Sequence, residues 1–172
     1  DVPPSNPNNV GVDWGGWFNF AYFNFEDNQD HTKQEERYDL YLWGSATLAQ
    51  AHDVYARMRF SYLDFQGGGP EGRSDDWQGP YVDRLFYEFN LRKATLRKDK
   101  RSLPYNVFTK VGRQYVEFGT GLALSLPMDA VIVGGELGGV EVTGLLGKTI
   151  ESMSNIDQSP WVQPRSNRCF YG

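Results

Sequence analysis

The sequence has little cysteine, little histidine and no long apolar run, and each shortage excludes a class of protein. Its single cysteine, Cys169, leaves the 172-residue chain unable to form an internal disulfide. One cysteine and two widely separated histidines, His31 and His52, do not make a zinc site. No segment approaches the roughly 18 consecutive apolar residues of a membrane-spanning helix, and the mean hydropathy is −0.56. The net charge of −5 predicts no general attraction to nucleic acid.

Aromatic residues and glycines are abundant, and apolar residues alternate with polar ones. Aromatic residues make up 15% of the chain, and 19 residues are glycine. Such alternation is typical of strands that contact water on one face. It predicts about seven strands, over residues 17–25, 38–48, 54–65, 81–91, 106–115, 130–137 and 140–150. Residues 1–13 are expected to form an extended N-terminal segment, and residues 14–172 a single domain of strands and loops.

The lengths of the predicted strands and connectors favour a membrane barrel. Most strands run about 9–12 residues, whereas strands of soluble sheets average about 5–6 and a tilted transmembrane strand needs roughly 9–11. The connectors 26–37, 66–80 and 116–129 are long, and 49–53 and 138–139 are short. Outer-membrane barrels alternate long external loops with short periplasmic turns in this way. The connector 92–105 is an exception, because it should be periplasmic but is long and basic.

The two faces of the predicted strands differ in polarity. Within residues 54–65, Val54, Met58 and Phe60 share one face, and Arg57 and Arg59 share the other. Within residues 81–91, alternation places on one face Asp83, Leu85, Tyr87, Phe89 and Leu91. An apolar face towards lipid and a charged face towards water is the pattern of an outer-membrane barrel. A soluble antiparallel sandwich or lipocalin-like barrel alternates in the same way, so alternation alone leaves that interpretation open.

One run of residues resembles a known family. It reads V-G-R-Q-Y-V-E-F-G-T-G-L-A-L-S-L-P-M-D-A-V, followed after a short gap by G-G-V-E-V. This is similar to the alginate-export type of outer-membrane porin, in which a strand ending in G-R-Q leads into a Gly-rich loop that contains Pro-x-Asp. The matching residues are Gly112, Arg113, Gln114, Gly119, Gly121, Leu124, Pro127, Asp129, Gly139 and Val140.

The resemblance implies a large single-chain barrel in the outer membrane of a Gram-negative bacterium, with a charged lumen that passes a polyanionic or oligomeric solute. About seven strands are too few for such a pore, and bacterial single-chain barrels have an even count. Residues 169–172 also do not alternate like a final strand. The chain is therefore expected to be an N-terminal part of a larger up-and-down β-barrel, surrounded by outer-membrane lipid and lipopolysaccharide.

The charged face of the strands holds the candidate solute pathway. Guanidinium groups attract carboxylates and phosphates, and acidic neighbours would fix their orientation. The candidates are Arg37, Asp39, Arg57, Arg59, Arg84, Glu88, Lys110 and Arg113. Arg113 has the parity of Val107 and Val111, so it reaches the lumen only where a bulge or the barrel rim relocates it. The alternative interpretation is that these charges only solvate a water-filled lumen.

Three connectors carry further candidates. The connector 116–129 is apolar for an external loop, so we expect it to fold inward as a constriction or to contact a partner chain. Its candidate residues are Gly119, Gly121, Leu124, Pro127 and Asp129. A second connector is acidic and offers Ca²⁺ ligands without an EF-hand pattern, so a solvated loop is preferred for Glu26, Asp27, Asp30, Glu35 and Glu36. Asp75 and Asp76 are interpreted in the same way. The basic connector 92–105 is interpreted as a solvated turn, with phospholipid headgroups or a periplasmic or membrane protein partner as the alternative.

The sequence predicts a pore rather than an enzyme. His31 is placed in an external loop and His52 in a periplasmic turn, so they do not share a site, and no Gly-rich phosphate loop of the Walker type is present. No metal or cofactor is expected. The predicted function is an outer-membrane channel for anionic or polar solutes, including poly- or oligosaccharides. The alternatives are a structural or partner-binding barrel with a plugged lumen, and a soluble β-sandwich binding module.

Overall fold

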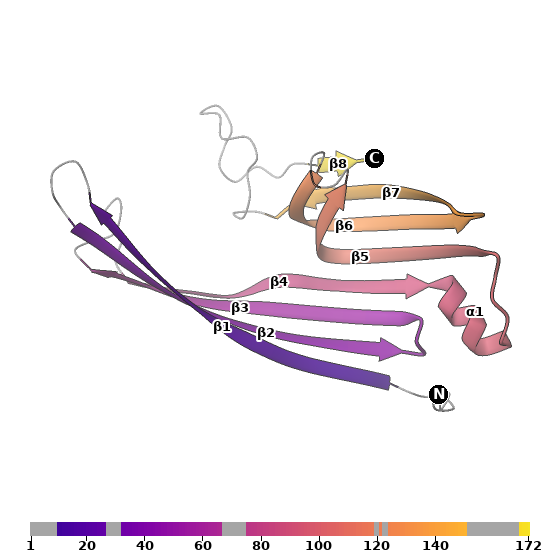
Figure 1. Cartoon of the computed structure of the whole chain (residues 1–172), viewed down its shortest axis with the longest axis horizontal. Helices are drawn as coiled ribbons and strands as arrows, with labels where there is room; N and C mark the ends of the chain where they lie inside the picture. The colour runs from indigo at the N-terminus through magenta and orange to yellow at the C-terminus, as the bar shows by residue number, and fades with distance from the viewer. Residues whose placement is uncertain (1–9, 27–31, 67–74, 119–120, 122–123, 151–168) are drawn as a thin grey trace. The chain divides into compact units, whose positions relative to one another are not determined.

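Eight strands and one helix make up the described part of the chain in a computed structural model (Figure 1). The structure describes residues 10–26, 32–66, 75–118, 121, 124–150 and 169–172. The elements are β1 (Val10–Glu26), β2 (Thr32–Leu48), β3 (His52–Gln66), β4 (Asp76–Asn90), α1 (Leu91–Asp99), β5 (Tyr105–Phe118), β6 (Leu124–Leu137), β7 (Val140–Thr149) and β8 (Cys169–Tyr171).

The strands pair in chain order, from β1 to β8, and form one antiparallel sheet. In the described residues β1 and β8 are not neighbours, so the sheet is open and does not close into a barrel. The predicted all-β, up-and-down arrangement is thereby confirmed as an open sheet. The count of about seven strands is wrong, because Cys169–Tyr171 pair with β7 as a short eighth strand. Three residues are too few for an alternating pattern to reveal it.

Most strands are longer than the alternation predicted, and two tight turns fix their register. β1 and β2 have 17 residues each, and β5 and β6 have 14 each. Ala49, Gln50 and Ala51 connect β2 to β3, and Gly138 and Gly139 connect β6 to β7. Positive φ values occur at Ala49, Gln50, Gly138 and Gly139. Two successive positive φ angles suit the right-handed twist of paired strands, which makes the two-residue turn of Gly138 and Gly139 favourable.

The chain divides into two compact units. Unit 1 consists of Asp1–Asp13, Ser45–Tyr55 and Arg84–Gly172. Unit 2 consists of Trp14–Gly44 and Ala56–Asp83. Within the described residues, unit 2 therefore contains one part of β1 to β4, and unit 1 contains the other part of these strands with α1 and β5 to β8.

An apolar cluster lies in unit 1. Its buried members are Val116, Leu126, Met128, Ala130 and Leu145. Partly buried residues pack against them, including Phe170 of β8. The cluster members of β5 and β6 occupy every second position, so these strands turn one apolar face towards a packed core.

This cluster corrects the prediction of an inward constriction loop over residues 116–129. β5 continues to Phe118 and β6 begins at Leu124, so Leu124, Pro127 and Asp129 belong to a strand and not to a loop. Gly121 does lie in the turn, with a φ of +82°, and its N–H donates to the carbonyl of Phe118. Gly119 lies outside the described residues. The apolar side chains avoid water by packing against one another across the β5–β6 hairpin.

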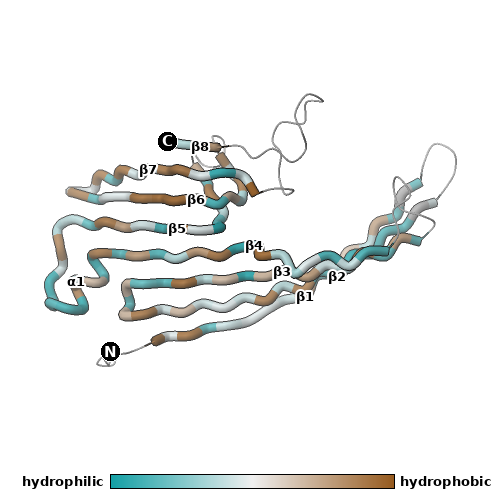
Figure 2. The backbone as a smooth tube through the Cα atoms, turned by 180° about the vertical axis from the view of Figure 1, so that it is seen from behind, coloured by the Kyte–Doolittle hydropathy of each residue, from teal (hydrophilic) through white to brown (hydrophobic). Residues whose placement is uncertain are grey.

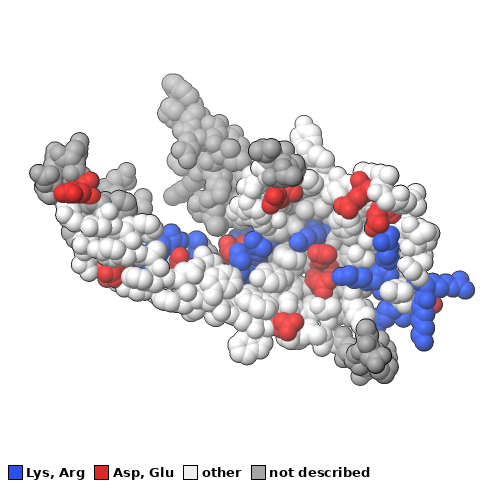
Figure 3. Space-filling view, viewed as in Figure 1, with Lys and Arg blue, Asp and Glu red and all other residues white. Residues whose placement is uncertain are grey.

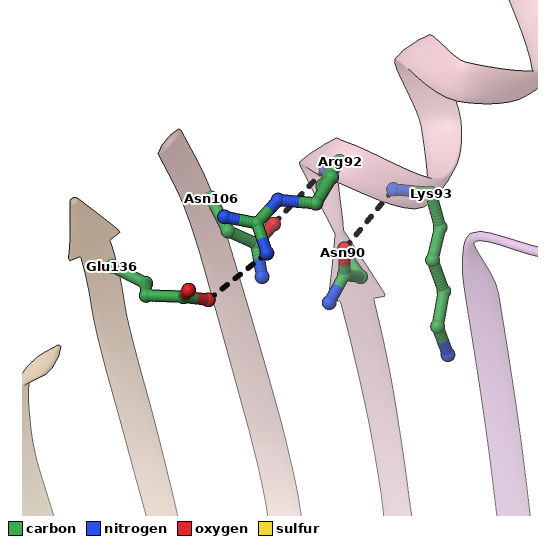
Figure 4. A network of polar contacts seen from close by, with 5 residues as sticks. All are labelled: Asn90, Arg92, Lys93, Asn106 and Glu136. Atoms are coloured by element: carbon green, nitrogen blue, oxygen red, sulfur yellow. Dashed lines mark hydrogen bonds and ion pairs between the residues drawn. The ribbon is translucent and has the colours of Figure 1, made fainter. Parts of the chain in front are cut away.

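The basic connector that was predicted as a solvated turn forms helix α1. Leu, Arg, Lys and Ala favour helix, and Asn90 caps its start: the Asn90 side chain accepts a hydrogen bond from the Lys93 N–H at 3.1 Å. The helix is fixed to the sheet through Arg92, whose N–H donates to Asn106 Oδ1 at 3.0 Å and whose Nη1 donates to Glu136 Oε2 at 3.1 Å (Figure 4). The connector is therefore an ordered element attached to β5 and β6.

In unit 2 the apolar side chains are exposed and the charged side chains are more buried, which is the reverse of a soluble sheet. Leu42 and Met58 are 47% and 44% exposed. On the other face, the side chains of Arg57 and Asp83 are 18% and 15% exposed. We call the side with Leu40, Leu42 and Met58 the apolar face of unit 2, and the side with Asp39, Arg57 and Asp83 its charged face. Figure 2 shows the alternation of hydrophobic and hydrophilic residues along the strands.

Unit 1 has two comparable faces. Its apolar face carries Leu85, Val111 and Val133, which are exposed. Its charged face carries Glu88 and Lys110, and the buried cluster described above lies on the same side of β5, because Lys110 and Val116 share strand parity. The charged face of unit 1 is therefore polar along one part of β5 and apolar along the other.

Candidate functional site

Arg57 is fixed on the charged face of unit 2 by an acid and two aromatic rings. Its Nε donates to Oδ2 of Asp83 at 2.6 Å, and its Nη2 forms an ion pair with the same oxygen. Its guanidinium carbon lies 5.5 Å from the ring centroid of Trp17 and 5.8 Å from that of Tyr41. These two rings stack with their centroids 4.7 Å apart. The rings attract the cation and the carboxylate offsets its charge, so Arg57 is oriented and largely neutralised.

A second acid on this face is buried. Asp39 is 8% exposed. Its carboxylate accepts a hydrogen bond from Arg37 Nε at 2.9 Å and one from Ser61 Oγ at 2.5 Å. Two donors stabilise the ionised carboxylate, as burial of a charge requires. The structure therefore brings together the candidate residues Arg37 and Asp39, and it adds Ser61.

Arg59 differs from these paired residues. Its guanidinium carbon lies 5.6 Å from the ring centroid of Tyr81. Among the described residues, no carboxylate lies within ion-pair distance of Arg59, and its buried Nε has no hydrogen-bond partner. In a buried environment an unused charged donor is costly. Arg59 is thus the cation of this face that is best placed to receive an anion.

In unit 1 the predicted residues Glu88 and Lys110 are direct register partners of β4 and β5. Lys110 Nζ lies 3.9 Å from Glu88 Oε2 and 4.0 Å from the ring centroid of Phe86. The ammonium group therefore has both an acidic and an aromatic neighbour. Arg84, predicted to line the lumen, has its guanidinium carbon 5.9 Å from the ring centroid of Tyr115, a residue that is exposed.

Arg113 lies on the apolar face of unit 1, with Val111 and Tyr115. It forms a two-point ion pair with Asp129, its register partner on β6, with distances of 2.9 Å for Nε to Oδ1 and 3.2 Å for Nη2 to Oδ2. The pairing of β5 with β6 runs without interruption from Tyr105 to Phe118, so Arg113 keeps the strand parity of Val111, and its placement in a lumen stays a prediction.

The structure also explains the G-R-Q and Pro-x-Asp runs. Arg113 faces Asp129, and Tyr115 faces Pro127, so the two runs lie opposite one another in one hairpin. Gln114 is buried, and its side-chain N–H donates to the Ala130 carbonyl at 3.3 Å. Gly112 has a φ of +126°, and a Cβ there would lie 2.2 Å from the Leu85 carbonyl oxygen. These residues fix the packing of β4, β5 and β6.

Sequence reasoning missed several residues of the charged face. Asp83 was expected on the apolar face with Leu85, but it pairs with Arg57. Trp17 and Tyr41 were identified as strand residues without a role. Both residues lie on the same strand face as polar neighbours, and this placement was the signal that could have identified them.

Among the described residues no group of three or more His, Cys, Asp or Glu side chains is arranged to hold a metal ion. Of the acidic segment considered for Ca²⁺, Asp27 and Asp30 lie outside the described residues, and Glu36 accepts a hydrogen bond from the Tyr38 hydroxyl. Asp75 accepts a hydrogen bond from the Phe65 N–H at 2.9 Å, and Asp76 begins β4.

Comparison with models of protein families, with curated proteins and with solved structures gives no match. No helix in the described ranges is both long enough and apolar enough to cross a membrane. The charged faces hold most of the candidate residues. Each combines ion pairs with a cation stacked on an aromatic ring, an arrangement that can contact polar and anionic solutes.

Proposed function

We propose that this chain forms the wall of an outer-membrane channel of the alginate-export porin type, which passes anionic or polar solutes along the charged faces. The observation that carries the proposal is the reversed exposure of unit 2. Large apolar residues such as Leu42 and Met58 are exposed, whereas Arg57, Asp83 and Asp39 are more buried. Exposed apolar surface of this extent marks contact with lipid or with another protein.

Strand length supports a membrane location. The shortest of β1 to β6 has 14 residues, which corresponds to about 46 Å at roughly 3.3 Å per residue and to about 33 Å along the membrane normal at a tilt of about 45°. Each of these strands is therefore long enough to cross an apolar belt of about 25 Å. In such a membrane the edges of β1 and β8 need pairing partners, because unpaired backbone groups are costly in lipid.

Charge pairing supports a role for Arg59 in anion passage. Arg57, Arg37 and Lys110 have acidic neighbours, so they contribute oriented dipoles more than net charge. Arg59 stacks on Tyr81 without an acidic neighbour in the described part. Weak, unsaturated contacts let a solute bind and leave, which conduction requires.

The test is ion selectivity in planar lipid bilayers, measured as the reversal potential under a salt gradient. The variant Arg59→Gln should lower the preference for anions, because it removes the unpaired cation. The variant Asp83→Asn should raise that preference, because it leaves the charge of Arg57 uncompensated. Lys98→Gln serves as the control, since Lys98 is an exposed residue of α1. Unchanged reversal potentials in both charged-face variants would refute the proposed solute pathway.

A barrel with a plugged lumen is the second candidate. The buried cluster around Val116 and Met128 lies on the same side of β5 as Lys110, where a water-filled lumen would be polar. Absence of conductance in a protein that inserts into bilayers would favour this second function over the first.

A further inference from the structure

A row of charged residues crosses the apolar face of unit 1. Arg113 of β5 is the register partner of Asp129 on β6, and Asp129 is in turn the register partner of Lys148 on β7. Register partners in an antiparallel sheet point to the same side. We call these three residues the charged row.

The charged row lies at a border between an apolar and a polar part of this face. The next row towards the short β6–β7 turn consists of the register partners Val111, Val131 and Leu146, which are 41%, 40% and 63% exposed. On the other side of the charged row lies Tyr115, which is also exposed and whose hydroxyl shares a hydrogen bond with the Ser125 hydroxyl. The apolar surface of β5, β6 and β7 therefore ends at the charged row.

The spacing of two tyrosines on β5 gives the level of this border in a membrane. Tyr105 and Tyr115 are exposed and share strand parity. Their separation in sequence corresponds to about 33 Å along the strand and to about 23 Å along the membrane normal at a tilt of about 45°. Aromatic residues flank the apolar belt of a membrane barrel at about this spacing. With lipid on this face, the charged row lies where the lipid headgroups begin, so the inference rests on the membrane location in the proposed function.

Two cations at this border lack an acidic partner in the described part of the chain. Lys148 is exposed, and no described carboxylate lies within ion-pair distance of its ammonium group. The same holds for Arg84, whose guanidinium carbon lies 5.9 Å from the ring centroid of Tyr115. An aromatic ring orients a guanidinium group without neutralising it. The ion pair within the charged row is neutral overall, and Glu117 lies nearer the end of β5, so cations exceed acids at the border.

We propose that Arg84 and the charged row bind the phosphate groups of anionic membrane lipids, whose acyl chains cover Val111, Val131 and Leu146. A guanidinium group donates two parallel hydrogen bonds to a phosphate, and an ammonium group attracts it as a point charge. A zwitterionic lipid brings its own cation to the border and gains less. A second copy of this face would bring the same excess of cations against it, so charge complementarity favours an anionic lipid. This placement is the alternative to the predicted position of Arg84 and Arg113 in a lumen.

The test compares two double variants of equal charge in the purified chain. Arg84→Gln with Lys148→Gln removes the two unpaired cations of the border. Lys98→Gln with Arg101→Gln is the control, because it removes two cations from the basic segment over α1, where Figure 3 shows Lys and Arg gathered. Native mass spectrometry in a nonionic detergent measures the binding of phosphatidylglycerol and of phosphatidylcholine with the same acyl chains. Glycerol 3-phosphate is added as a competitor, because it distinguishes a lipid from a water-soluble phosphate ester.

The wild-type chain should bind phosphatidylglycerol at least about tenfold more tightly than phosphatidylcholine, as expected for charge-assisted hydrogen bonds. Arg84→Gln with Lys148→Gln should reduce this preference to less than about twofold, and the control should keep it. Arg84→Lys with Lys148→Arg retains both charges and should keep most of the preference. The proposal is overturned if the wild-type chain shows no preference, if the two double variants lose it equally, or if glycerol 3-phosphate competes as effectively as the lipid.

Two further measurements separate this proposal from the proposed channel. If Arg84→Gln with Lys148→Gln shifts the reversal potential in planar bilayers and leaves the lipid preference unchanged, these side chains line the solute pathway and the lipid proposal fails alone. If the wild-type chain does not float with phosphatidylglycerol vesicles and gives no conductance, the membrane location fails and both proposals fail with it.

Discussion

Apolar and polar residues alternate along the strands of both units, but the two units bury different faces. In unit 1, alternate residues of β5, β6 and β7 pack into a buried apolar cluster. In unit 2, alternate residues of β2 and β3 are arginines and an acid, and the apolar residues of the same strands are exposed. The comparison shows that alternation specifies two unlike faces of a sheet but does not specify which of them is buried.

Removing a large side chain should affect the two units very differently. Met128 of unit 1 is 0% exposed, whereas Met58 of unit 2 is 44% exposed. Met128→Ala is expected to lower the free energy of unfolding by about 2–5 kcal/mol, because it leaves a cavity in a packed cluster. Met58→Ala should lower it by less than about 1 kcal/mol. Urea unfolding in one detergent, followed by tryptophan fluorescence, gives both values; equal losses would contradict the distinction between the units.

A second comparison uses the two glycines that strands of units 1 and 2 require. A Cβ at Gly112 would lie 2.2 Å from the Leu85 carbonyl oxygen, and a Cβ at Gly79 would lie 2.8 Å from the Arg59 carbonyl oxygen. Both residues have φ values that L side chains rarely adopt. Each alanine substitution should lower stability by about 1–3 kcal/mol, with Gly112→Ala the more severe. Gly135→Ala, where nothing lies nearer than 3.8 Å, is the control for unfolding measurements.

A double-mutant cycle on Arg113 and Asp129 sharpens the comparison of the apolar faces. If lipid covers the apolar face of unit 1, Arg113→Leu should cost about 2–3 kcal/mol, since an unpaired carboxylate is left in an apolar environment. The double variant Arg113→Leu with Asp129→Leu should then recover most of this loss. In water an exposed ion pair contributes about 0–1 kcal/mol. A small effect of the single variant in lipid vesicles would argue that water covers this face.

The smallest expected effect concerns the C-terminal end of α1. Lys100→Gly should raise the free energy of unfolding by about 1 kcal/mol, because glycine adopts the positive φ at this position without steric strain. Lys98→Gly lies inside α1 and should lower stability by about 1 kcal/mol. Thermal unfolding should show a higher melting temperature for Lys100→Gly and a lower one for Lys98→Gly. This result would confirm that the backbone at Lys100 is strained.

The sequence predicted the strands and their pairing order because period-two alternation is a local signal. It did not predict that residues 116–118 and 124–129 are strand, because glycines and Pro127 interrupt the pattern and proline is unfavourable inside a sheet. Burial in the cluster overrides that preference, and this is a tertiary effect that no local window contains.

The candidate site was predicted in part. Asp39 and Glu88 were expected to pair with some of the candidate cations, and they pair with Arg37 and Lys110. Asp83 was expected on the face of Leu85, but it pairs with Arg57. The unbroken pairing of β5 with β6 leaves Arg113 on the face of Val111, so its placement in a lumen stays a prediction. Helix α1 was missed because it has no apolar periodicity, although Asn90 followed by helix-forming residues was an available signal.

The position of Arg113 opposite Asp129 has a consequence for how this hairpin can change during evolution. One added residue in β6 before Met128 would turn the side chains that follow it to the opposite side, bring Met128 to the surface and separate the ion pair. These two strands can therefore exchange residues only one for one.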